Sequence, residues 1–176
     1  VGSEMCIRDS VWRAATAIQF ANKIREYNIE FFEEPVFADD IPGLAEFKRG
    51  TDIPLATGEH EYTRYGVRDL FLNHAVDILQ CDATRVGGYT EMLRIMALSQ
   101  AFNKAFAPHG MEHMHMHLVA AAPNGVYLEK LFMFDEVVKS VYLNAPEPVN
   151  GIMTIPEKPG LGLELNMDYI KECKGR

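Results

Sequence analysis

Five ionisable side chains stand at or just after the ends of short apolar runs in this sequence: Glu33, Glu59, Asp82, His109 and Glu129. If these runs are parallel strands, their downstream ends converge on one face, where barrel enzymes place their chemistry. Any one of these residues alone is compatible with a solvated charge at the end of a strand. Because the arrangement recurs in five successive units, it favours a shared site.

The carboxylates in this series predict a metal site. Glu33 and Glu59 end neighbouring predicted strands, and Asp82 ends the next one. Carboxylate oxygens are hard ligands, which suit Mg²⁺ rather than Zn²⁺. We therefore expect Glu33 and Glu59 to be Mg²⁺ ligands.

Asp82 and His109 have the residue types of a general base and its orienting group, one strand-helix unit apart. A carboxylate that bonds one ring nitrogen of a histidine fixes its tautomer and stabilises the imidazolium. The other ring nitrogen is then available to take a proton from carbon. The pair predicts a catalytic dyad built from two strands.

Three more polar residues are candidates for substrate contact: His60, Glu112 and His113. His60 directly follows Glu59, but successive strand residues point to opposite sides, so a supporting or outward role for His60 stays open. A zinc site formed by His113, His115 and His117 is disfavoured because no acidic or cysteine partner has a zincin spacing. We expect these three histidines to line the pocket or to pack against neighbouring methionines.

The elements that would position these residues alternate regularly. Apolar periodicity and breakers predict helices over 12–27, 41–49, 65–73, 90–102 and 114–121. Strands are predicted over 29–32, 53–56, 75–80, 104–107 and 126–128. This alternation predicts a parallel sheet wrapped by helices.

The predicted fold class is α/β, a partial (β/α)₈ barrel with about the last five strands and their helices. Residues 11–130 would form this barrel domain, and the proline-containing residues 131–176 would be an extended C-terminal segment leaving it. A complete barrel needs eight strands and about 250 residues. Residues 1–10 resemble a recurrent sequencing scar and are excluded from the fold prediction.

Composition narrows the class of protein. Lys plus Arg number 17 against 25 Asp plus Glu, the net charge is -8, and no basic run is present, which disfavours nucleic acid as a partner. No apolar stretch approaches the roughly 20 residues that span a bilayer, which disfavours a membrane protein. Three widely spaced cysteines fit a reducing compartment, so a cytoplasmic protein is expected.

Six motifs together resemble the mandelate racemase branch of the enolase superfamily, in order and spacing, over about residues 11–170. They are Phe-Phe-Glu-Glu-Pro, Thr-Gly-Glu-His, Cys-Asp-Ala-Thr-Arg-Val-Gly-Gly, Ala-Pro-His-Gly, Tyr-Leu-Glu-Lys and Pro-Gly-Leu-Gly-Leu-Glu. By this resemblance Glu33 and Glu59 are the second and third metal ligands. Asp82 and His109 are the catalytic dyad, and Glu129 hydrogen-bonds the enolate oxygen.

The resemblance also implies a reaction. It predicts Mg²⁺-dependent removal of the proton next to a carboxylate, followed by dehydration of a sugar acid, an aldonate or aldarate, by a homo-oligomeric parent enzyme. Racemisation, epimerisation or cycloisomerisation through the same enediolate is the alternative. The family's first metal-ligand Asp would fall near Ile7, where Asp9 does not match it, and its Lys base would lie further upstream. This chain alone is therefore expected to be an inactive, truncated part of that enzyme.

Overall fold

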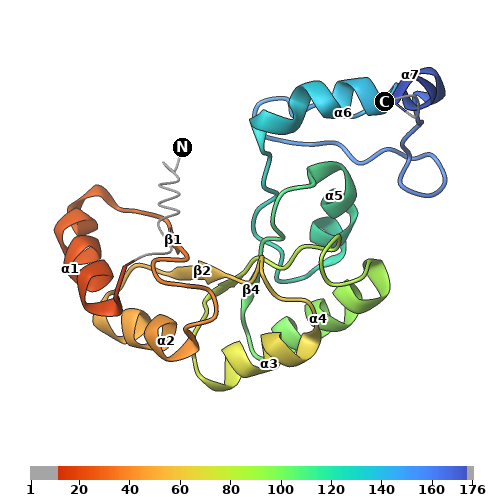
Figure 1. Ribbon diagram of the computed structural model, residues 1–176. Coiled ribbons are helices and arrows are strands. Elements are labelled where there is room, and N and C mark those ends of the chain that lie inside the picture. Colours follow the sequence, from red (N-terminus) through yellow and green to blue (C-terminus); the bar gives the residue numbers. More distant parts are fainter. Residues whose placement is uncertain (1–11, 174–176) are drawn as a thin grey trace.

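The computed structural model describes residues 12–173, and its centre is a parallel sheet of four strands in the order β1-β2-β3-β4 (Figure 1). The strands are short and consecutive in the chain. They are β1 (Phe32–Glu33), β2 (Leu55–Thr57), β3 (Ile78–Leu79) and β4 (Ala105–Phe106). Each pairs in parallel with the next. The predicted α/β class and partial barrel are confirmed.

Helices precede, connect and follow the strands. They are α1 (Ala14–Ile24), the 3₁₀ turn η1 (Arg25–Tyr27), α2 (Ile41–Gly50), α3 (Arg64–Leu72), α4 (Tyr89–Ala101) and α5 (Glu112–Ala121). Helices α1 to α4 follow the convex side of the sheet, which leaves its other face towards the interior of an open half-barrel (Figure 1). Side chains cap two of the helices, since Asp40 accepts from the Gly43 amide and Thr63 from the Tyr65 amide.

Strand alternation separates two apolar layers. Side chains of one parity pack under the helices and are fully buried: Phe32, Leu55, Leu79 and Phe106. The opposite parity forms a smaller cluster on the inner face: Phe31, Ala56, Ile78, Ala105 and Ala107. Glu33, the last residue of β1, has this inner parity, and Asp82 and His109 continue it beyond the ends of β3 and β4. The same alternation that builds the core therefore directs the polar residues into the barrel interior.

The fifth strand, predicted over 126–128, is not formed as a strand. This segment makes an isolated parallel bridge between Phe106 and Gly125, supported by a hydrogen bond from the Val126 amide to the Phe106 carbonyl. A lone bridge fixes little backbone, because sheet pairing is stable only when several residues pair on both sides. The position of the fifth unit is nevertheless the predicted one.

The segment after Lys130 is less extended than predicted. It contains the 3₁₀ turn η2 (Phe132–Phe134) and two short helices, α6 (Asp135–Val141) and α7 (Met167–Cys173). Single antiparallel bridges join Tyr142 to Leu165 and Val149 to Ile152. Helices α6 and α7 lie together, apart from helices α1 to α4 (Figure 1).

Two predictions concern other properties of the chain. The suggested scar at 1–10, with Asp9, lies outside the described residues. Within 12–173, none of the helices has the length and apolar character needed to cross a membrane.

Candidate active site

The carboxylates of the candidate metal site come from the ends of β1 and β2. Glu33 ends β1, and Glu34 follows it with a left-handed φ of 40°. Glu59 follows Gly58, whose φ is 127° and where a Cβ would lie 3.0 Å from Leu79 Cδ1. Only glycine fits this turn without strain, and the turn brings Glu59 back over the sheet. All three glutamates are at least 95% buried.

Glu34, Glu59 and His60 form the group of possible metal ligands found in the described part of the chain, with ligand atoms within 4.8 Å of one another; Glu59 was predicted from the sequence, and Glu34 takes the place expected for Glu33 in this group. Glu34 accepts from the Thr57 hydroxyl at 3.1 Å, and its other oxygen lies 3.6 Å from His60 Nε2. Burial raises the pKa of Glu34, and the negative charge of Glu59 raises it further. The carboxylates of Glu34 and Glu59 hold negative charge away from water, and this favours the binding of a cation between them.

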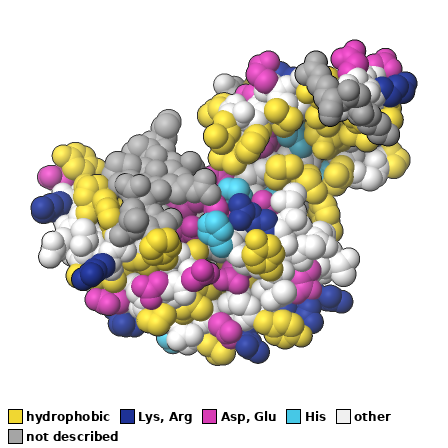
Figure 2. Space-filling model, in the orientation of Figure 1, with side chains coloured by type: hydrophobic (Ala, Val, Ile, Leu, Met, Phe, Trp, Pro, Cys, Tyr) yellow, Lys and Arg dark blue, Asp and Glu magenta, His cyan; other side chains and the backbone are white. Residues whose placement is uncertain are grey.

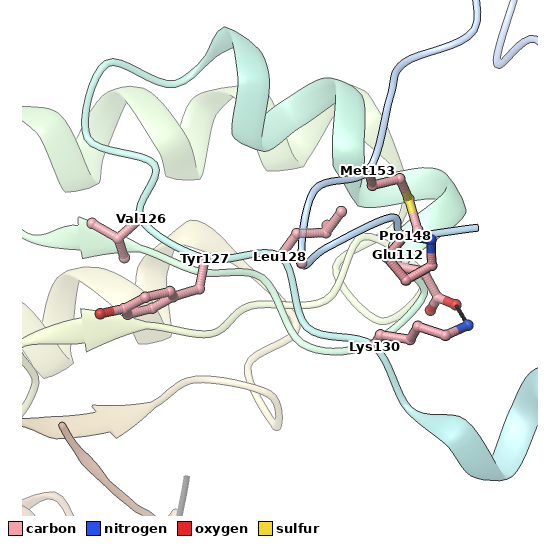
Figure 3. A pocket seen from close by; sticks show the side chains of 8 residues that line it. Glu112, Val126, Tyr127, Leu128, Lys130, Pro148 and Met153 are labelled. Atoms are coloured by element: carbon pink, nitrogen blue, oxygen red, sulfur yellow. Dashed lines mark hydrogen bonds and ion pairs between the residues drawn. The ribbon is translucent and has the colours of Figure 1, made fainter. Parts of the chain in front are cut away.

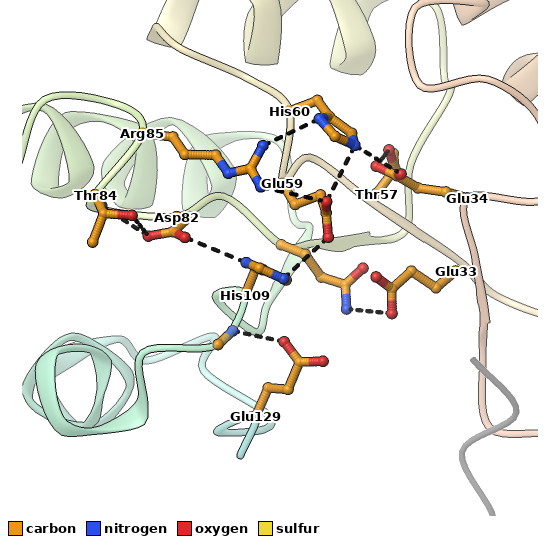
Figure 4. A network of polar contacts seen from close by, with 12 residues as sticks. Glu33, Glu34, Thr57, Glu59, His60, Asp82, Thr84, Arg85, His109 and Glu129 are labelled. Carbon is orange, nitrogen blue, oxygen red and sulfur yellow. Dashed lines mark hydrogen bonds and ion pairs between the residues drawn. The ribbon is translucent and has the colours of Figure 1, made fainter. Parts of the chain in front are cut away.

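His60 supports Glu59. Its Nε2 lies 3.1 Å from Glu59 Oε1, and its Nδ1 lies 3.2 Å from the Arg85 guanidinium (Figure 4). Because Arg85 can only donate, Nδ1 is the acceptor and Nε2 carries the proton towards Glu59. These contacts favour a supporting role for His60, which the sequence had left open. At the rim, 43% of its side chain stays exposed.

Asp82 and His109 meet as the sequence suggested. His109 Nδ1 lies 3.3 Å from Asp82 Oδ2, and Nε2 lies 3.1 Å from Glu59 Oε2 (Figure 4). The Thr84 amide and hydroxyl both donate to Asp82 Oδ1 at 2.8 Å. The imidazole therefore lies between a carboxylate on the β3 loop and one on the β2 loop.

The charges of this dyad support each other. Burial tends to raise the pKa of Asp82, but the hydrogen bonds from His109 and Thr84 outweigh it and lower this pKa to about 2. The hydrogen bond to Asp82 raises the pKa of His109 against the opposing effect of burial, and the charge of Glu59 adds to the rise. An ionised Asp82 accepts only, so Nδ1 of His109 is a donor. Nε2 is the nitrogen that can exchange a proton with a substrate.

Glu129 lies beside this loop. Its Oε2 accepts a hydrogen bond of 2.6 Å from the Gly110 amide, directly after His109. The structure thus brings Glu129 next to the dyad (Figure 4). In the space-filling view, histidine, acidic and basic side chains gather near the centre of this face, beside the junction with the C-terminal helices (Figure 2).

Glu112 and His113 are placed elsewhere. Glu112 Oε1 lies 3.4 Å from Lys130 Nζ, and His113 Nε2 lies 3.0 Å from the Pro146 carbonyl. Both side chains are 3% exposed and face the C-terminal segment. Their displacement follows from Gly110 and Met111, which have left-handed φ of 49° and 43° and turn the chain sharply before α5 begins.

A separate pocket of about 220 Å³ lies at this junction (Figure 3). It is lined by residues of α5, the 126–130 segment and the C-terminal segment: Glu112, Val126, Tyr127, Leu128, Lys130, Pro148, Gly151 and Met153. None of them is a ligand or dyad candidate. Glu112 therefore belongs to the wall of this second cavity.

The three histidines of α5 do not form a zinc site. His113 faces the Pro146 carbonyl, and His117 Nε2 lies 3.1 Å from the Leu161 carbonyl. His115 turns towards the backbone of the dyad loops. The metal-ligand group found in the described residues includes none of the three.

Sequence reasoning assigned no role to Glu34 or Arg85, and it expected His115 only to line the pocket or to pack against methionines, although all three contact the network. Glu34 was visible as the second carboxylate of the Glu-Glu-Pro motif, but its direction depends on a left-handed φ. Arg85 lies three residues after Asp82 in the same loop. For His115 no sequence signal separates it from its neighbours His113 and His117.

Comparison with known proteins gives the family. Residues 9–169 match the family described as Enolase C-terminal domain-like. The chain belongs to this family. The enolase superfamily resemblance of the sequence motifs is thereby confirmed.

Two curated relatives of this enolase-type chain are sugar-acid dehydratases. An L-rhamnonate dehydratase of Saccharopolyspora erythraea is 34% identical over 177 residues, which cover 94% of this chain and 45% of that protein. An L-talarate/galactarate dehydratase of Salmonella typhimurium is 36% identical over 155 residues, covering 88% of this chain and 38% of that protein. The chain thus spans less than half the length of these relatives.

A solved structure agrees in fold. The L-talarate dehydratase of Polaromonas sp. JS666, complexed with Mg and L-glucarate, superposes with a TM-score of 0.85 at 32% identity. The superposition covers 93% of this chain and 44% of that chain. Mg²⁺ and sugar acids are therefore ligands of structural neighbours of this enolase-type chain.

Proposed function

We propose that the protein carrying this chain removes the proton α to the carboxylate of a sugar acid and then eliminates water. The observation that carries the proposal is the position of His109 between Asp82 Oδ2 and Glu59 Oε2, at 3.3 and 3.1 Å. One ring nitrogen is fixed by an ionised carboxylate, and the other faces the candidate metal ligand. A substrate bound beside Glu59 would meet Nε2, the ring nitrogen on that side, which supports the role of general base for His109.

The residues divide into three roles. His109 takes the α-proton at Nε2, and Asp82 stabilises the imidazolium that forms. Glu129, beside the Gly110 amide, supports the enediolate oxygen. His60, held between Arg85 and Glu59, orients the Glu59 carboxylate at the exposed rim of the site.

The buried acids fit a Mg²⁺ ion. Glu33 and Glu59 would hold it, with Glu34 as a neighbouring oxygen donor, because three buried carboxylates form a hard, negatively charged donor set. When bound, Mg²⁺ supplies the positive charge that stabilises an enediolate beside a carboxylate. In Figure 4 Glu59 contacts His109, and Glu33, at the end of β1, lies nearby and accepts a hydrogen bond of 3.4 Å from the Gln80 amide.

The substrate class follows from the polar rim and the relatives. Acidic, basic and imidazole groups around His60 and Arg85 suit a chain of hydroxyl groups better than an apolar ligand. The curated relatives act on L-rhamnonate or on L-talarate and galactarate. We therefore propose an aldonate or aldarate as the substrate of a cytoplasmic, homo-oligomeric enzyme.

The test is an acid-sugar screen. Because the relatives are more than twice as long, it uses the longest open reading frame that contains this chain, alongside the 176-residue chain. With Mg²⁺ in D₂O, the longer protein should convert at least one aldonate or aldarate to its 2-keto-3-deoxy product, and EDTA should stop the reaction. Exchange of the α-proton without dehydration would indicate racemisation or cycloisomerisation. If neither reaction occurs with any acid sugar, the proposed function is wrong.

A further inference from the structure

His115 is the one side chain of α5 that reaches the backbone of both dyad loops in the described residues. Its Nε2 lies 3.0 Å from the Ala83 amide nitrogen, next to Asp82. Its Nδ1 lies 2.7 Å from the Gly110 carbonyl oxygen, next to His109. The ring is fully buried.

These two partners fix the tautomer of His115. A backbone amide only donates, so Nε2 must be an unprotonated acceptor. A carbonyl only accepts, so Nδ1 must carry the proton. The ring is therefore neutral, in agreement with its pKa, which burial lowers. The nearest charged group, Asp82 Oδ1, lies 3.6 Å from Nε2 and is already bonded by Thr84.

Two side chains bind the backbone of Gly110, one at its amide and one at its carbonyl. Its amide donates to Glu129 and its carbonyl accepts from His115. Gly110 and Met111 both adopt left-handed φ, a conformation that costs free energy at Met111 because it carries a Cβ. Contacts that hold such a turn determine where the preceding residue, His109, places its ring.

We propose that His115 is a positioning residue, whose neutral imidazole, together with the direct backbone bond from the His109 amide to the Cys81 carbonyl, sets the relative placement of the Asp82 loop and the His109 loop. Its mechanistic value rests on the proposed function of the dyad. The link is geometric, since one rigid ring bonds the residue after Asp82 and the residue after His109. A side chain with a single polar end cannot make both bonds.

Two substitutions separate the two bonds. In His115→Asn the amide group lies near the position of Nδ1, so it can still donate to Gly110 but does not reach Ala83. In His115→Gln the oxygen extends to the position of Nε2, so it can still accept from Ala83 but leaves Gly110 unbonded. His117→Asn is the matched control, because His117 lies on the same helix and contacts Leu161 instead.

The experiment is NMR of the 176-residue chain without substrate. Amide exchange of Ala83 should accelerate at least about tenfold in His115→Asn and stay near wild type in His115→Gln. The Nδ1 proton signal of His109, which reports its bond to Asp82, should weaken or shift in both variants and persist in His117→Asn. If Ala83 loses protection while the His109 signal is unchanged in both variants, His115 is only structural and the proposal is wrong.

This outcome does not depend on catalysis. The NMR signal of His109 is read in the absence of substrate, so an inactive wild type would overturn the proposed function and leave the positioning test intact. If His115→Asn fails to fold, His115→Gln alone decides: an unchanged His109 signal there contradicts the proposal, and a changed one supports it.

Discussion

Asp82→Asn tests the electrostatics of the dyad in one substitution. Asparagine keeps an oxygen that can accept from Thr84, but it removes the charge facing His109. The pKa of Asp82 is about 2 in the folded chain against an ordinary value of 3.8. At about 1.4 kcal/mol per pH unit, this difference corresponds to about 2–3 kcal/mol of folding free energy, part of it from Thr84.

The pH dependence of this loss has a definite sign. The lowered pKa of Asp82 makes its contribution complete above its ordinary pKa and lost as the pH falls towards 2. The raised pKa of His109 makes its contribution complete below its ordinary value of 6.5 and lost as the pH rises through the folded value. The pair is therefore strongest between these limits, and Asp82→Asn should cost most at about pH 5.5 and less at about pH 9.

Urea denaturation in EDTA, followed by fluorescence of the single tryptophan, Trp12, measures this effect. Glu46→Gln is the control, because Glu46 is an exposed carboxylate on α2. We expect a loss of about 1–2 kcal/mol at the lower pH for Asp82→Asn and within about 0.5 kcal/mol for the control. An equal loss at both pH values, or one no larger than the control, would refute the reasoning.

Four further outcomes follow. Glu34→Gln should stabilise the metal-free chain at neutral pH but not near pH 4, because the raised pKa of Glu34 penalises its charged form; denaturation at both values checks this, and stabilisation at pH 4 alone would contradict it. Leu79→Ala should cost about 2–5 kcal/mol in the same assay, since Leu79 is fully buried, and a cost below about 1 kcal/mol would be inconsistent with this core. Lys130→Met should speed limited proteolysis of residues 131–166, because Lys130 contacts three carboxylates, Glu112, Asp135 and Glu147; unchanged cleavage would show that this ion cluster does not hold the segment. Mg²⁺ titration should shift amide signals at the ends of β1 and β2, at least about tenfold more weakly in Glu59→Gln, and equal binding by that variant would exclude Glu59 as a ligand.

Helices and strand positions were predictable because local patterns determine them. The helix predicted over 41–49 is observed at Ile41–Gly50, and the one over 90–102 at Tyr89–Ala101. Apolar periodicity and breakers such as Gly87-Gly88 are short-range signals. The shared location of the polar residues was predictable for the same reason, because consecutive parallel strands place their downstream ends on one edge of the sheet.

What failed depends on backbone geometry and distant contacts. The strand at 126–128 reduces to one bridge at Gly125, because pairing requires a neighbour that local sequence does not reveal. Glu112 and His113 lie against the C-terminal segment after the left-handed turn at Gly110 and Met111, which local sequence does not reveal, and their contact with a substrate stays a prediction. His115 lies two residues after His113, about 200° around the helix, and therefore faces the dyad loops.

The most direct measurement is α-proton exchange in D₂O by His109→Asn, in the longest open reading frame that contains this chain. The account predicts that exchange from the face served by His109 is abolished while Mg²⁺ binding survives, because His109 contacts Glu59 but is not proposed as a ligand. Exchange and dehydration that persist near the wild-type rate would contradict the account, since another group would then be the base.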